Sequence, residues 1–133
     1  MDTNVLVYAY DRQSGEKHEI AKRFLLDLVR NERFVCSAQV LNELASVLLK
    51  RKGLPIGIVR EIVEEVSALG IVVPVVGDMT HRALEAVANS GLSFWDALVW
   101  VAAREAGATE LFTEDFQHDQ RLGEVRFVNP FLS

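Results

Sequence analysis

The sequence predicts an α/β domain in which a mainly parallel sheet lies between layers of helices. The 133 residues are half hydrophobic, which suits one domain with a sizeable core and leaves no room for two. Short, strand-like apolar segments alternate with longer segments whose apolar residues recur every three or four positions. This alternation is typical of parallel strands connected by helices, so we expect a three-layer α/β/α arrangement.

The first half of the chain begins with an apolar segment that fits two structures. Residues 5–10 are strand-like in composition, but their length also fits a short buried helix. A helix is expected at 16–31, where apolar residues are spaced three and four apart, and a short strand at 34–36. Ser37 then fits the cap of a helix that runs to about Lys52 and ends at Gly53.

The second half repeats the alternation. We expect a helix from Pro55 to Leu69, a buried strand at 71–76, and a helix capped by Asp78 or Thr80 and ending near Asn89. A helix from Ser93 to about Arg104 and a strand at 109–113 follow. A polar loop at 115–123 then leads to a last strand at 125–128. Glycines follow three of these helices, at the position where a chain most often leaves a helix.

The Ser93 helix carries one charge in an otherwise apolar sequence. Ser93 fits an N-cap, and Asp96 follows three residues later as in a capping box. The rest of the helix is apolar all round, so we expect it to be buried on every side, with Trp95 and Trp100 in the core. Asp96 therefore has two interpretations. It is either a helix cap facing the positive end of the dipole or a functional carboxylate, because a buried charge is costly unless it is paired or coordinated.

Charge and cysteine content narrow the function classes. The net charge of −5 and the pI of about 5.2 give no general attraction for nucleic acid, so any RNA contact requires a local basic patch or bound metal ions. The single cysteine, Cys36, lies in an apolar segment and is interpreted as a core residue. We recognise neither a signal peptide nor an apolar run of membrane-spanning length, and we expect a cytoplasmic protein.

Four acidic residues stand at the ends of predicted elements. Asp2 precedes the first apolar segment, Glu43 and Asp96 lie early in helices, and Asp115 follows a strand. Ligands of open α/β sheets bind beyond the carboxyl ends of the strands, so these residues can meet at one sheet edge. Clustered carboxylates repel one another, and a divalent cation that prefers oxygen ligands, Mg²⁺ or Mn²⁺, would neutralise them. The three histidines lack zinc-ligand spacing, and we find no glycine-rich phosphate loop.

Four stretches in this order carry a family resemblance. They are residues 2–8 (DTNVLVY), 37–44 (from Ser37 to Glu43-Leu44), 93–99 (SFWDALV) and 113–116 (TEDF), the last followed by 128–131 (VNPF). In these stretches the chain resembles a PIN domain, and in particular a VapC-type toxin ribonuclease. The resemblance implies a PIN fold, metal-dependent endoribonuclease activity, a homodimer and neutralisation by a cognate VapB-like antitoxin. By match, Asp2, Glu43, Asp96 and Asp115 take the acidic positions, and Thr3, Asn4 and Thr113 take the supporting polar ones.

The chain departs from that resemblance in two places. PIN domains usually carry several apolar residues before the first acid, which form a central strand, whereas only Met1 precedes Asp2 here. We therefore expect either a start upstream or a truncated first strand, and an α-amino group close enough to compete with a cation. Asp119 stands where related chains often have a small residue, and we interpret it as a solvated loop residue.

The resemblance suggests a mechanism. Asp2, Asp96 and Asp115 would hold Mg²⁺ or Mn²⁺ directly, and Glu43 would do so directly or through water, for hydrolysis of an RNA phosphodiester. In support, Thr113 would orient a metal-bound water and Asn4 would fix Asp2. Two alternatives remain open at this point: a housekeeping PIN-domain nuclease of RNA processing, and a catalytically silent module whose acidic pocket binds a basic partner segment.

Overall fold

The computed structural model describes residues 1–132 of the chain. Its helices are α1 (Thr3–Tyr10), the short 3-10 helix η1 (Arg12–Ser14), α2 (Glu16–Arg30), α3 (Ala38–Lys50), α4 (Ile56–Ala68), α5 (Gly77–Ser90) and α6 (Phe94–Glu105). Its strands are β1 (Val35–Ser37), β2 (Ile71–Val73), β3 (Glu110–Phe112), β4 (Arg121–Leu122) and β5 (Val125–Val128). Apart from α1, β4 and the segment around β2, these bounds agree with the predicted elements to within about two residues.

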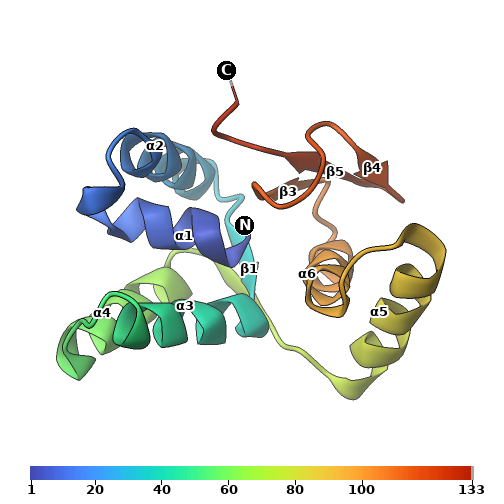
Figure 1. Ribbon diagram of the computed structural model, residues 1–133, viewed down its shortest axis with the longest axis horizontal. Helices are drawn as coiled ribbons and strands as arrows, with labels where there is room; N and C mark the ends of the chain where they lie inside the picture. The colour runs from blue at the N-terminus through green and yellow to red at the C-terminus, as the bar shows by residue number, and fades with distance from the viewer. Residues whose placement is uncertain (133) are drawn as a thin grey trace.

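The strands form two short sheets. In the first, β1 pairs in parallel with β2; in the second, the order is β3-β5-β4, with β3 parallel and β4 antiparallel to β5. The predicted α/β class and its mainly parallel pairing are confirmed. Figure 1 shows α1 to α4 on one side of the molecule, α5 and α6 on the other, and the N-terminus between β1 and β3.

Residues 5–10 form a helix, so the strand interpretation of this segment is wrong. Val5 and Leu6 are fully buried, and Val7 and Ala9 are nearly so. α1 packs against both α2 and α3, and a segment enclosed in this way shows no polar face by which its sequence reveals helical periodicity. Asp2 is its N-cap residue, with an extended backbone (φ −79°, ψ 162°).

The structure corrects the prediction around β2. The strand ends at Val73 rather than Val76, because Pro74 follows it and cannot donate a ladder hydrogen bond. Nor is the segment buried throughout, since the Ile71 and Val76 side chains are largely exposed. Neither Asp78 nor Thr80 caps the following helix, whose N-cap position is Val76. The polar loop at 115–123 contains the short strand β4, which pairs with β5.

α6 is less uniformly buried than its sequence predicts. Residues 97–102 are buried, and Trp100 donates a hydrogen bond from its indole nitrogen to the Leu122 carbonyl (3.0 Å). Trp95 contradicts the prediction, because 62% of it is exposed. It lies in the first turn, where the neighbouring Phe94 and Asp96 are half-buried. The helix therefore anchors its middle in the core and presents its N-terminal turn, including Asp96, to an open edge.

The core continues through both halves of the molecule. Its fully buried large side chains include Leu6, Leu44, Leu48, Val101, Leu111 and Phe127. Cys36 is buried among them, as predicted. Within the described residues, none of the helices has the length and apolar character required to cross a membrane.

Candidate metal centre

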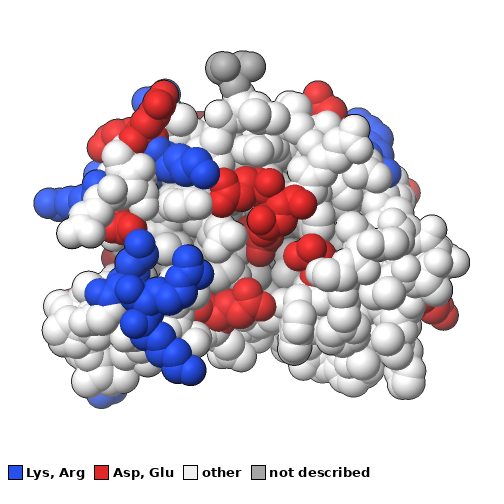
Figure 2. All heavy atoms as spheres, in the orientation of Figure 1, with Lys and Arg blue, Asp and Glu red and all other residues white. Residues whose placement is uncertain are grey.

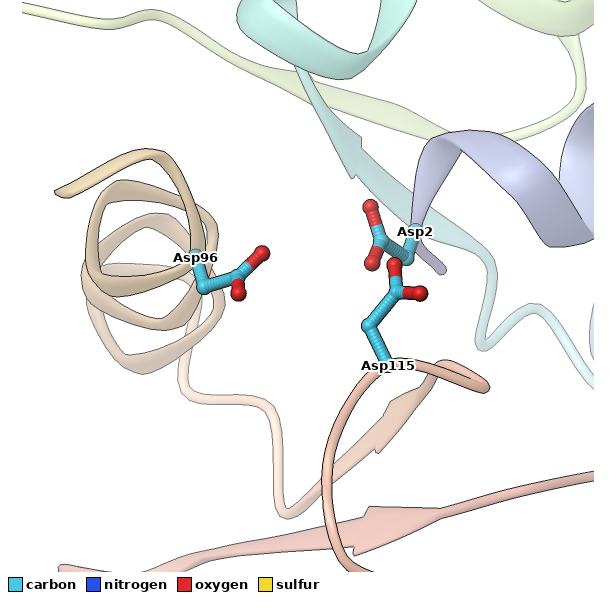
Figure 3. Close-up of side chains that lie close together, drawn as sticks. All are labelled: Asp2, Asp96 and Asp115. Atoms are coloured by element: carbon cyan, nitrogen blue, oxygen red, sulfur yellow. The ribbon is translucent and has the colours of Figure 1, made fainter. Parts of the chain in front are cut away.

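Three of the four predicted acids come together at the junction of three segments. Asp2 caps α1, Asp96 lies in the first turn of α6, and Asp115 lies in the loop that follows β3. One carboxylate oxygen of each lies within 4.8 Å of the other two, and Figure 3 shows the side chains directed toward a common point. Asp2 is buried, Asp96 is half-buried and Asp115 is exposed, so the acidic trio opens to solvent on one side.

Asp2 is held rigidly by its neighbours. Its backbone N–H donates to the Phe112 carbonyl (2.9 Å), which fixes the start of the chain to the end of β3. Its carboxylate accepts hydrogen bonds from the Thr3 backbone N–H (2.7 Å) and from the Thr113 hydroxyl (2.9 Å). The same hydroxyl accepts from the Asp115 backbone N–H (3.1 Å). Thr113, which is almost fully buried, thus links two members of the trio.

The Asp96 carboxylate does not cap the helix. The Ser93 hydroxyl accepts the Asp96 backbone N–H (3.2 Å), as predicted for an N-cap. Within residues 1–132, no side chain or backbone group donates a hydrogen bond to the Asp96 carboxylate, which is directed at the other two acids (Figure 3). The helix start is therefore stabilised by Ser93, and the geometry leaves the Asp96 carboxylate available to a ligand.

Glu43 lies outside the trio and is connected to it through Thr3, the neighbour of Asp2. Its carboxylate accepts hydrogen bonds from the Thr3 hydroxyl (2.9 Å) and the Gln39 side-chain amide (2.8 Å). The Gln39 amide also reaches the Trp95 carbonyl (3.4 Å). Because Thr3 follows Asp2 and Trp95 precedes Asp96, this chain of contacts ties the backbones of two trio residues together. Asn4 forms no hydrogen bond with Asp2 in the described part of the chain, so its predicted support is not seen.

The electrostatics of the trio suit a bound cation. Partial burial, together with the charges of Asp2, Asp96 and Glu114, raises the pKa of Asp115 from 3.8 to about 6. Carboxylates that repel one another in this way are the oxygen donors that Mg²⁺ and Mn²⁺ prefer. The donor set therefore fits a hard divalent cation, while the assignment of these residues as ligands stays a prediction.

A family model describes the fold that carries this trio. The PIN domain model matches residues 1–122. The chain belongs to the PIN domain family. A crystal structure of VapC20 from Mycobacterium tuberculosis superposes on it with a TM-score of 0.63 over 86% of this chain and 88% of that one, at 22% sequence identity. At this identity the likeness establishes the fold alone. No curated protein matches the chain in sequence.

This PIN domain carries site neighbours that sequence reasoning missed. Glu114, next to Asp115, accepts hydrogen bonds from the Tyr8 hydroxyl (2.6 Å) and the Lys17 ammonium group (2.7 Å). Burial opposes ionisation of Glu114, but these two bonds hold its pKa below the ordinary value. Gln39 was missed too, although its spacing of four residues from Glu43 on a helix was a usable signal.

The surface around the PIN domain's acidic trio is polarised. Figure 2 shows acidic side chains gathered near the centre of one face, with Lys and Arg side chains beside them on the side where α1 to α4 lie. Asp119 lies outside the trio. It pairs with Arg126 (2.9 Å), as expected of a loop residue. His18 is buried, and its ring donates from Nδ1 to the Tyr8 carbonyl (2.9 Å).

Proposed function

We propose that this PIN domain is a metal-dependent endoribonuclease that hydrolyses RNA phosphodiester bonds and acts as the toxin of a toxin–antitoxin pair. The observation that carries the proposal is the trio of Asp2, Asp96 and Asp115, whose oxygens lie within 4.8 Å of one another at an open edge of the fold. The similar M. tuberculosis protein, VapC20, is a toxin that cleaves the sarcin–ricin loop, and this supports the choice of RNA as substrate.

The three aspartates would hold Mg²⁺ or Mn²⁺. When bound, such an ion lowers the pKa of a coordinated water and stabilises charge on phosphate oxygens. The chain's own residues orient the site: Thr113 fixes Asp2 relative to Asp115, and Glu43 with Gln39 fixes the start of α1 relative to the start of α6. Asp115 holds a proton below about pH 6 and must release it before it can act as a ligand.

The test pairs RNA cleavage with thermal melting. Purified protein is incubated with sarcin–ricin loop RNA and an unrelated hairpin, with Mg²⁺, with Mn²⁺ or with a chelator. Asp96→Asn removes one charge of the trio, while Ser93 still caps the helix. We expect cleavage that requires the metal and falls at least about 100-fold in the variant, the size of effect typical of a lost electrostatic contact in catalysis. The metal-free melting temperature should stay unchanged or rise, because repulsion in the trio decreases.

Asp78→Asn is the matched control, since Asp78 also lies in the first turn of a helix but pairs with Arg82 outside the trio. The control should cleave RNA at the parent rate. An Asp96→Asn protein that melts lower yet cleaves at the parent rate would make Asp96 a structural residue and contradict the mechanism.

The same experiment separates the competing functions. A silent module would bind basic peptides in the acidic pocket and cleave no RNA with any metal. A housekeeping nuclease would cleave RNA, but its expression would not arrest growth. We expect growth arrest that Asp96→Asn abolishes, and release from arrest by a small co-expressed antitoxin whose basic segment enters the acidic trio.

A further inference from the structure

Four basic side chains gather around the C-terminal end of α1. Arg12 follows Asp11, the C-cap residue of that helix, and Lys17 lies in the first turn of α2. The Lys52 ammonium group, just beyond the end of α3, lies 2.7 Å from the Asp11 carboxylate, and Arg51 precedes Lys52 in the chain. All four basic residues are exposed. We call Arg12, Lys17, Arg51 and Lys52 the basic patch.

The helix dipoles explain only half of the basic patch. A cation at the C-terminal end of a helix is favoured by the dipole, and Arg51 and Lys52 stand at that end of α3. Arg12 and Lys17 stand at the starts of η1 and α2, where the dipole favours acids instead. Within residues 1–132, moreover, neither Arg12 nor Arg51 forms an ion pair. The patch therefore carries positive charge that is available to an anion from outside the chain.

Lys17 places one cation of the basic patch beside the acidic trio. Its ammonium group donates to the Glu114 carboxylate (2.7 Å), and Glu114 directly precedes Asp115. The same ammonium group lies 4.8 Å from the centre of the Tyr8 ring and 5.1 Å from that of the Phe131 ring, so two aromatic side chains help to hold it in place. An ammonium group has three donors, and Lys17 can therefore still donate to a phosphate.

α1 separates the rest of the basic patch from the acidic trio. Figure 1 shows α1 lying across one face of the molecule, with its start near the centre and its end at the left. In the same orientation, Figure 2 shows Lys and Arg side chains on that side of the acidic centre, and mostly neutral surface on the side of α5 and α6. The 8 residues of α1 span roughly 12 Å at 1.5 Å per residue. Phosphates of a stacked strand are roughly 3.4 Å apart along its axis, so this length corresponds to about three or four nucleotides.

We propose that the basic patch binds phosphates of the RNA backbone on the α1 side of the acidic trio. The inference rests on the proposed ribonuclease function for the phosphate that is cleaved at the trio. The patch supplies the attraction for RNA that a net charge of −5 does not provide. Contacts with phosphates carry no sequence information, so the patch positions the RNA without selecting its sequence. RNA is favoured over an acidic peptide, because its regularly spaced phosphates can reach both the patch and a cation held by the trio.

The test measures RNA binding in the absence of cleavage. A fluorescently labelled RNA hairpin of mixed sequence is titrated with the protein in a chelator at several salt concentrations. Arg12→Gln combined with Arg51→Gln removes two cations of the patch without breaking an ion pair of the described chain. We expect the dissociation constant at low salt to rise about tenfold or more. The slope of log affinity against log salt should fall by roughly 1.4 to 1.8, because each phosphate contact contributes about 0.7–0.9.

Arg30→Gln combined with Arg121→Gln is the matched control. Both residues are exposed, and they lie at the end of α2 and in β4, outside the basic patch. This control removes the same charge and should keep the affinity and the salt slope of the parent, and both double variants should melt as the parent does. Equal weakening by the two double variants, or an unchanged salt slope in the patch variant, would overturn the inference. A Glu-rich peptide that binds the parent more tightly than RNA does would assign the patch to an acidic protein and would also overturn it.

The measurement is independent of catalysis. If the protein cleaves no RNA with any metal but binds RNA through Arg12 and Arg51, the nuclease proposal fails and the patch stands as an RNA-binding surface. If the protein cleaves RNA with metal while its RNA affinity is insensitive to both substitutions, the nuclease proposal stands and the inference about the patch is wrong.

Discussion

Asp115 changes its protonation state close to neutral pH. Its pKa is raised to about 6 in the folded chain by partial burial and by the neighbouring acids, against 3.8 ordinarily. Between these two values the folded state binds more protons than the unfolded state, so this residue's contribution to metal-free stability is largest below pH 4 and is lost as pH rises through 6. Asp115→Asn should therefore flatten the decline in melting temperature between pH 4 and pH 7.

A bound divalent cation should stabilise the folded protein more at neutral pH than at acidic pH. A cation that binds only the folded state stabilises it by about 2.7 kcal/mol when present at 100 times its dissociation constant. At pH 7.5 we expect Mg²⁺ or Mn²⁺ to raise the melting temperature of the parent, and a chelator to remove the gain. Below pH 5 the gain should shrink, because protons compete for Asp115. If divalent metal leaves the melting temperature unchanged at every pH, the proposed metal site is wrong.

Trp95 is an exposed aromatic side chain next to Asp96. Its ring packs against Phe94 in an edge-to-face arrangement (centroids 5.3 Å apart), and most of its surface is open to solvent. Stacking of one base on an aromatic side chain contributes about 1–3 kcal/mol. Trp95→Ala should raise the KM for RNA about tenfold or more with little change in melting temperature, while Trp95→Phe should keep most of the affinity.

The control for Trp95 is Trp100 on the same helix. Trp100 is buried and bonded to the Leu122 carbonyl, so Trp100→Ala should lower the melting temperature strongly. If Trp95→Ala also melts much lower, or binds RNA as tightly as the parent, Trp95 has no role in holding substrate.

At the scale of elements, α3 connects the starts of α1 and α6. Its Glu43 accepts from Thr3 and Gln39, and Gln39 reaches Trp95, so one turn of α3 spaces Asp2 from Asp96. We expect Glu43 to act mainly as a positioning residue. Glu43→Gln can retain both contacts, because the Thr3 hydroxyl can accept as well as donate, whereas Glu43→Ala removes both.

The measurement is kcat with saturating metal for the two Glu43 variants. Glu43→Gln should keep a kcat at least about tenfold above that of Glu43→Ala, as expected when geometry rather than charge is lost. If both variants lose kcat equally and bind metal equally weakly, the Glu43 charge instead contacts the cation directly.

At the scale of the whole molecule, exposed apolar side chains concentrate on one stretch of the chain. Most of the large ones lie in α4, β2, α5 and the segment before α5: Ile56, Ile58, Ile71, Val75, Val76 and Leu84. Exposed large apolar side chains are frequent at interfaces between subunits. We expect a homodimer in sedimentation at micromolar concentration, and Ile56→Lys should weaken it at least about tenfold. Leu26→Lys, on an exposed apolar position of α2, is the control and should leave the dimer intact. A parent that sediments as a monomer would contradict this.

The sequence by itself determined the amphipathic helices, the short parallel strands and the four acids worth examining. Ser93 and Ser37 were identifiable as caps because an N-cap is a local interaction between a hydroxyl and the backbone three residues later, and both are observed. Local signals failed for residues 5–10, because a helix enclosed by α2 and α3 lacks the polar face that reveals a helical period.

The tertiary structure alone decided which acids meet. Asp2, Asp96 and Asp115 are far apart in the chain and converge because α1, α6 and the end of β3 pack at one point, whereas Glu43 is drawn aside by its contacts with Thr3 and Gln39. The raised pKa of Asp115 and the exposure of Trp95 likewise depend on groups distant in sequence. Repulsion, burial and strand pairing are set by distances in space, and the order of residues does not encode those distances locally.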